Sequence, residues 1–182
     1  MNIALATWQQ AINEHRTPTI LVTGTKRWEG SPIEDHSINS PHGRWIGTDI
    51  AAGEGGEGVD IVIDLCDIGL AGPRFHGIFS PSTLEHIKRP WLAINSIAKA
   101  LLPNGHLYLQ THQTFPIHGY PNDYFRFSTE ALQVMTIDAG FKPESIITCY
   151  EYPCTITQPP EITRWNPYAP SYLNVCLFAS VT

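Results

Sequence analysis

Residues 75–111, FHGIFSPSTLEHIKRPWLAINSIAKALLPNGHLYLQT, carry the pattern that decides the fold. Residues 75–80 and 106–111 are short apolar segments that predict strands. Between them, residues 83–102 place apolar side chains at helical spacing, and Pro90 is expected to kink or break this helix. Residues 103–105, Pro-Asn-Gly, predict the turn before the second strand. A strand, a helix and a strand in this order are typical of a parallel sheet.

The same alternation continues on both sides of this segment. Further strands are expected over residues 19–22, 45–50, 59–65, 144–150 and 172–181. Helices are expected over residues 3–14, over 128–139 and, from the capping box Ser31-Pro32-Ile33-Glu34, over 31–39. The sequence therefore predicts an α/β fold with a mostly parallel sheet that is covered by helices on both faces.

Length and composition limit the class of protein. The chain has 182 residues, which predicts one domain over 1–182. Its net charge of −6 argues against a nucleic-acid partner, since such proteins usually carry an excess of basic residues. No apolar run approaches the roughly 18 residues of a membrane span, and the first residues do not resemble a signal peptide. We expect a cytoplasmic protein with four reduced cysteines, although Cys149 and Cys154 could ligate a metal; its oligomeric state stays open.

Polar and small residues follow the predicted strands, where parallel sheets bind their ligands. An acid after the second strand, Asp49, can accept hydrogen bonds from both hydroxyls of a ribose. Gly24 lets a ligand approach the backbone closely, and Asp64 followed by Leu65 can hold an adenine amino group and cover the ring. Each signal has an ordinary alternative, because Asp49 can be a loop acid that faces water and Gly24 a simple turn residue.

Residues 80–87 with 101–105, residues 49–50 with 59–65, and residues 118–128 form three segments. Together they resemble class I S-adenosylmethionine-dependent methyltransferases of the methyltransferase-11 type. Residues 80–87, SPSTLEHI, and 101–105, LLPNG, are similar to the family's Leu-Glu-His helix start and its Leu-Lys-Pro-Gly-Gly turn. Residues 49–50 and 59–65 resemble its second and third strands. Residues 118–128, HGYPNDYFRFS, resemble a subgroup with Pro-x-Asp-Tyr-x-Arg-Phe-Thr after the fifth strand.

The resemblance implies a Rossmann-like, doubly wound, seven-stranded sheet with an antiparallel last strand, and S-adenosyl-L-methionine as cofactor. The residues that it implies for cofactor binding are Thr23, Gly24, Thr25, Asp49, Ile50, Asp64, Leu65, Ser80 and Pro81. One motif departs from the family. Its first loop normally reads acid-x-Gly-x-Gly-x-Gly, whereas residues 22–28 here read VTGTKRW, with Val22 in place of the acid. Lys26 could contact the carboxylate of the cofactor.

Two segments, 112–127 and 151–171, are expected to form the lid over a substrate. His118, His112 and Asp123 are the candidate catalytic group, because a histidine suits a general base for an O- or N-methyl acceptor. They could equally be packing residues or hold a metal, but the His-x5-His spacing matches no metal motif and no metal is expected. Candidate substrate residues are Tyr124, Arg126 and Trp165. Arg126 could instead pair with Asp123, Trp165 could pack under a loop, and His86 is expected to be structural.

The predicted function is a methyltransferase that acts on a small-molecule acceptor. The alternative is a methyltransferase-like protein that binds the cofactor poorly and serves as a binding or scaffold partner, which the altered first loop supports. A dinucleotide-binding oxidoreductase is disfavoured because no Gly-x-Gly-x-x-Gly follows the first strand.

Overall fold

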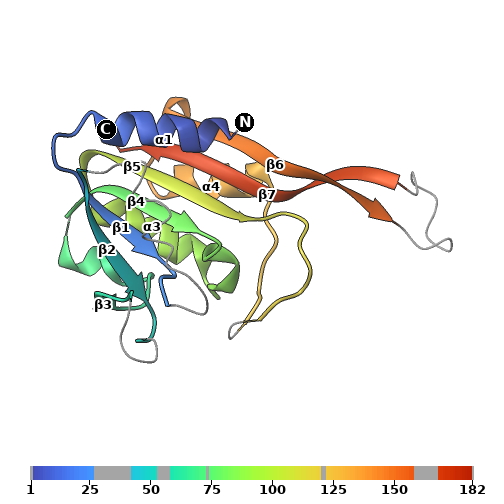
Figure 1. Ribbon diagram of the computed structural model, residues 1–182, viewed down its shortest axis with the longest axis horizontal. Helices are drawn as coiled ribbons and strands as arrows, with labels where there is room; N and C mark the ends of the chain where they lie inside the picture. The colour runs from blue at the N-terminus through green and yellow to red at the C-terminus, as the bar shows by residue number, and fades with distance from the viewer. Residues whose placement is uncertain are drawn as a thin grey trace.

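The strands form one sheet with a reversal in its order. The computed structural model describes residues 2–26, 42–52, 58–72, 74–119, 122–157 and 168–181. Within them a seven-stranded sheet has the order β3-β2-β1-β4-β5-β7-β6 (Figure 1). Its parallel strands are β1 (Thr19–Thr23), β2 (Arg44–Asp49), β3 (Ile61–Val62), β4 (Phe75–Pro81) and β5 (Leu101–His112). The last strand, β7 (Tyr168–Ser180), runs antiparallel between β5 and β6 (Ile146–Thr157). The predicted doubly wound sheet with an antiparallel last strand is confirmed.

Helices cover both faces of the sheet. Helix α1 (Ile3–Asn13) packs on one face, and α3 (Pro90–Ala100) and α4 (Thr129–Asp138) pack on the other (Figure 1). Neighbouring residues of β1 alternate between the two layers: Ile20 and Val22 join the core under α1, and Leu21 joins the core under α3 and α4. Burial on both faces explains why the strands are continuous apolar runs with few charges.

The helix predicted over 83–102 is broken at Pro90, as expected. The structure has a short 3₁₀ helix, η3 (Leu84–His86), and then α3, which begins at Pro90. Proline lacks an amide hydrogen and clashes with the preceding turn, so it can start a helix but rarely continues one. Two further 3₁₀ turns, η2 (Ile68–Ala71) and η4 (Pro143–Ser145), lie in the connections.

Several strand boundaries also differ from the prediction. The third strand is limited to Ile61–Val62 instead of 59–65, and β5 begins at Leu101, ahead of the expected turn at 103–105. The strand is irregular at this point, since Asn104 has a φ of 60° and the pairing with β4 passes from Phe75↔Leu101 to Gly77↔His106. Helix α4 follows Ser128, whose side chain accepts a hydrogen bond from the Ala131 amide, as expected for a cap. The helix predicted over 31–39 lies outside the described residues.

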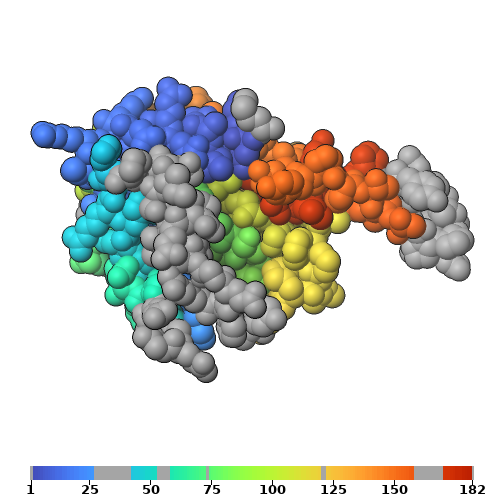
Figure 2. All heavy atoms as spheres, in the orientation of Figure 1, coloured from blue at the N-terminus to red at the C-terminus, as the bar shows by residue number. Residues whose placement is uncertain are grey.

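Strands β6 and β7 run further than the expected ends at 150 and 172. Their pairing continues from Pro153↔Tyr172 to Thr157↔Tyr168. The paired ends form a two-stranded ribbon that projects away from the helices and the rest of the sheet (Figures 1 and 2). Among the described residues, no helix is long and apolar enough to cross a membrane.

Candidate functional site

A pocket of about 370 Å³ opens at the carboxyl ends of β1 to β4. This is the edge where the strand order reverses between β1 and β4, which is the usual ligand site of such sheets. The residues predicted from the sequence that line it are Thr23, Gly24, Asp49, Ile50, Asp64, Leu65 and Tyr124. The lining also includes residues that the sequence did not single out for binding, among them Ser82, Thr83, Lys88 and Asn122.

Gly24 brings the loop after β1 against the loop after β4. Its φ is +68°, and a Cβ atom at this position would lie 2.6 Å from the Thr83 hydroxyl oxygen. Only glycine meets both requirements without strain, because other residues rarely adopt a positive φ. Gly24 is therefore required by the close approach of two loops that wall the pocket.

Three predicted cofactor residues lie beside the pocket and do not line it. Thr25 is fully buried, and its amide donates to the Thr48 carbonyl over 3.2 Å. Ser80 is also buried and accepts a hydrogen bond from the Thr23 hydroxyl at 2.7 Å. Pro81 accepts from the Thr83 hydroxyl through its carbonyl at 2.8 Å. These residues brace the loops that form the pocket wall.

The two acids that line the pocket are each held by backbone amides. Asp49 Oδ2 accepts from the Lys26 amide at 3.1 Å, and its Oδ1 accepts from the Ala51 amide at 3.4 Å. Asp64 Oδ1 accepts from the Cys66 amide at 2.9 Å. An ionised carboxylate can accept about four hydrogen bonds, so both side chains keep capacity for a ligand.

Arg126 pairs with Asp123, the alternative that the sequence left open. The guanidinium reaches both carboxylate oxygens of Asp123, with Nη2 at 2.6 Å from Oδ2, and also donates to the carbonyls of Phe115 and Pro116. The hydrogen bonds from Arg126 hold the pKa of the Asp123 carboxyl well below its usual range. This pair ties the two ends of residues 115–126 together. Trp165 lies outside the described residues, and the described part of 151–171 contributes nothing to the pocket lining.

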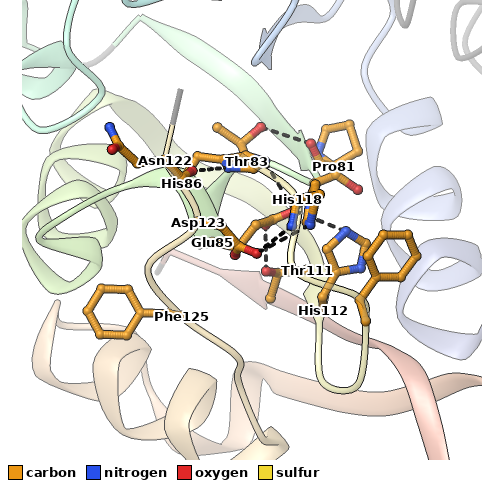
Figure 3. Close-up of polar contacts among 12 residues, drawn as sticks. Pro81, Thr83, Glu85, His86, Thr111, His112, His118, Asn122, Asp123 and Phe125 are labelled. Carbon is orange, nitrogen blue, oxygen red and sulfur yellow. Dashed lines mark hydrogen bonds and ion pairs between the residues drawn. The ribbon is translucent and has the colours of Figure 1, made fainter. Parts of the chain in front are cut away.

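Glu85 was missed by the sequence analysis and is the centre of a polar cluster. Its side chain is fully buried, and Oε2 accepts a hydrogen bond from the Thr111 hydroxyl at 2.7 Å. The other oxygen, Oε1, faces the Nε2 atoms of His112, His86 and His118 at 3.2, 3.8 and 3.9 Å (Figure 3). Burial raises the pKa of the Glu85 carboxyl, but contacts with His112 and Thr111 outweigh it and leave the pKa below its ordinary value. The sequence offers one sign of Glu85, a carboxylate among the apolar residues where the helix was predicted to begin.

The three histidines differ in their access to the pocket. His86 lines it, with Nδ1 bound to the Asn122 carbonyl at 2.5 Å. His112 is buried and stacks on Phe115 with ring centroids 4.1 Å apart. Neither His112 nor His118 is part of the described pocket lining. The catalytic role assigned to His118, His112 and Asp123 therefore stays a prediction.

Comparison with known proteins finds similar structures but no matching sequence family. No protein-family model and no curated protein sequence matches it. A SAM-dependent methyltransferase from Archaeoglobus fulgidus superposes with a TM-score of 0.68 at 13% identity, over 97% of this chain and 90% of that one.

Two further structures show the same similarity. The 1,6-didemethyltoxoflavin N1-methyltransferase of Burkholderia thailandensis superposes with a TM-score of 0.61 at 15% sequence identity, over 100% of this chain and 79% of that one. That structure contains 1,6-didemethyltoxoflavin and S-adenosylhomocysteine. A phosphoethanolamine N-methyltransferase of Haemonchus contortus superposes with a TM-score of 0.62 at 15% sequence identity, over 97% of this chain and 52% of that one. The chain thus has the fold of S-adenosylmethionine-dependent methyltransferases, as the motif resemblance implied.

Proposed function

We propose that this chain, which has the methyltransferase fold, binds S-adenosylmethionine in the pocket and transfers its methyl group to an oxygen or nitrogen of a small molecule. The observation that carries the proposal is the pocket itself. It lies where the strand order reverses, and Gly24, Asp49, Asp64 and Leu65 meet in its lining.

The pocket residues fit the parts of the cofactor. Asp49, fixed by the Lys26 and Ala51 amides, can accept hydrogen bonds from the two ribose hydroxyls. Asp64 can accept from the adenine amino group while Leu65 covers the ring. Gly24 leaves the loop after β1 without a side chain where the cofactor passes. Lys26, which also lines the pocket, supplies a cation for the cofactor carboxylate.

The chemistry demands placement more than proton transfer. The bound cofactor supplies a methyl group that is already activated by a sulfonium. The chain must hold the acceptor atom in line at about 3–3.5 Å and keep water away. Tyr124 and Asn122, from the predicted first lid segment, and His86, from η3, form the wall available for this task. The Arg126–Asp123 pair braces the segment that carries two of them.

The structural neighbours and the net charge favour a small acceptor. Two of the structural neighbours act on small nitrogen acceptors, the didemethyltoxoflavin and phosphoethanolamine enzymes. The net charge of −6 disfavours an acceptor in a nucleic acid.

Isothermal titration with S-adenosylmethionine and S-adenosylhomocysteine tests the proposal. Asp49→Ala should raise both Kd values by about 10- to 100-fold, because hydrogen bonds to a charged acceptor are lost. Asp67→Ala is the matched control, since Asp67 is exposed and lies outside the pocket lining. Absence of binding at millimolar cofactor would rule the proposal out, and an unchanged Kd in Asp49→Ala would remove Asp49 from the site.

One observation favours the second candidate, a methyltransferase-like binding protein. Val22 replaces the acid of the family's first loop, and its side chain is buried in the core under α1. The loop therefore lacks one anchor for the cofactor. Weak or absent binding in the same titration of the unaltered protein would favour this second function.

A further inference from the structure

We propose that Glu85, His112 and His118 form a binding site for a divalent transition-metal ion, with zinc as the representative cation. Glu85 Oε1 and one nitrogen of each histidine all lie within 4.8 Å of one another (Figure 3). The three residues come from separate parts of the chain: η3, the carboxyl end of β5, and the connection between β5 and α4. None of the three lines the pocket.

The first argument is the unsatisfied oxygen of Glu85. Oε2 has the Thr111 hydroxyl, whereas Oε1 is buried and makes no hydrogen bond of good geometry among the described residues, with His112 Nε2 as its nearest polar contact at 3.2 Å. A buried carboxylate oxygen that lacks a good partner is costly, because it has lost its contact with water. A cation at this position would satisfy it.

The second argument is the orientation of His112. Its Nδ1 lies 3.0 Å from Asn174 Oδ1, and the amide of Asn174 is fixed because Nδ2 donates to Glu151 Oε2 at 3.5 Å. In this orientation Asn174 Oδ1 accepts the hydrogen of His112 Nδ1. In a neutral ring this leaves the lone pair on Nε2, which points to Glu85 Oε1 at 3.2 Å.

His118 has the same arrangement. Its Nδ1 donates to the Pro116 carbonyl at 3.1 Å, so in a neutral ring its Nε2 carries a lone pair that faces Glu85. When both rings are neutral, two nitrogen lone pairs and a carboxylate oxygen face one another, and a metal ion between them removes their repulsion. Histidines that bind metals typically donate their other ring N–H to an oxygen in this way.

The donor set and spacing suit zinc. Two imidazole nitrogens, one carboxylate oxygen and an open fourth position are a known zinc arrangement. Tetrahedral zinc holds its ligand atoms about 3.3 Å apart, calculated from its bond lengths. Glu85 Oε1 lies 3.2 Å from His112 Nε2 and 3.9 Å from His118 Nε2, and all three ligand atoms lie within 4.8 Å of one another, so the His118 ring must move closer to the other two ligands to reach the tetrahedral spacing. The His118 side chain is 24% exposed, which gives the ion a path from solvent.

Such an ion would fasten one wall of the pocket. It joins His118, in the connection after β5, to the sheet and to η3. The same connection carries Asn122 and Tyr124, which line the pocket. This consequence for the acceptor rests on the proposed function, whereas metal binding itself does not.

Titration of the chelator-treated protein with zinc chloride tests the site. We expect one zinc ion per chain, a higher Tm with zinc, and d–d absorption of low-coordinate Co²⁺ when cobalt replaces zinc. His118→Ala and Glu85→Gln should each raise the zinc Kd by at least 100-fold. Asn174→Ala should raise it by about 10-fold, because His112 loses the group that orients it.

His42→Ala is the matched control, since His42 is an exposed histidine near the start of β2, and its Kd should equal that of the unaltered protein. If Glu85→Gln fails to fold, the His118→Ala variant still tests the proposal, because His118 is partly exposed. No zinc binding, or an equal Kd in His118→Ala, would overturn the proposal. The Asp49→Ala variant should bind zinc normally, so a failure of the cofactor proposal is distinguishable from a failure of this one.

Discussion

At the scale of single residues, the site separates into groups that the sequence reveals and groups that it hides. Asp49 and Asp64 were predicted because they follow strands, and the pocket contains both. Glu85 was hidden because its role depends on Thr111 and two histidines that are distant in the sequence. Local spacing cannot show which side chains a fold brings together, and the His-x5-His spacing gave no sign of a carboxylate between its members.

Gly24 gives a prediction with a close control. Gly24→Ala must place a Cβ at a φ of +68° and 2.6 Å from Thr83 Oγ1. Gly72→Ala has a similar φ of +76° but no atom within 4 Å. Gly72→Ala should lower the free energy of unfolding by about 1–3 kcal/mol through the backbone alone, because its φ of 76° and ψ of −179° lie in a region that only glycine adopts readily. Gly24→Ala should lower it further and also weaken cofactor binding, measured by urea denaturation and titration. Equal losses in the two variants would show that the contact with Thr83 is unimportant.

At the scale of elements, the helices and the mostly parallel sheet were predictable, but several ends were not. Pro90 was expected to interrupt a long helix, and it does so by starting α3. The ribbon of β6 and β7 was missed because Tyr152 and Pro153 interrupt the apolar pattern, although pairing continues beyond them. Pairing partners, which the sequence does not show, keep these residues in strands.

The connection between β5 and α4 depends on the Asp123–Arg126 pair. Asp123→Asn should lower the free energy of unfolding at pH 7 by about 1–3 kcal/mol, since a charge-assisted pair is lost. The pKa of Asp123 is lower in the folded chain than its ordinary value of 3.8. Its stabilisation is therefore complete above about pH 4–5 and is lost as the pH falls toward the folded pKa. The difference between the two proteins should shrink accordingly in acid.

Asp138→Asn is the control for this pair, since Asp138 is an exposed aspartate at the end of α4. It should show no such loss at pH 7. A variant Asp123→Asn as stable as the unaltered protein at neutral pH would mean that the pair does not brace the connection.

At the scale of the whole molecule, the order β3-β2-β1-β4-β5-β7-β6 places the loops after β1 to β4 around one pocket. Alternation of strands and helices was enough to predict a parallel sheet that binds its ligand at the carboxyl ends of its strands, although it did not give the strand order. The alternation pattern gives no information on the acceptor. The part of the pocket wall that would face the acceptor comes from connections that show no periodicity in the sequence. The motifs at 80–87 and 118–128 resemble a family, and solved structures with that fold align over nearly the whole chain.

The most direct measurement is a crystal structure of the protein grown with S-adenosylhomocysteine. The account predicts density for the nucleoside in the pocket of Gly24, Asp49 and Asp64, with the ribose hydroxyls against the Asp49 carboxylate and the adenine beside Leu65. Cofactor bound at another surface, or an empty pocket at saturating concentration, would contradict it.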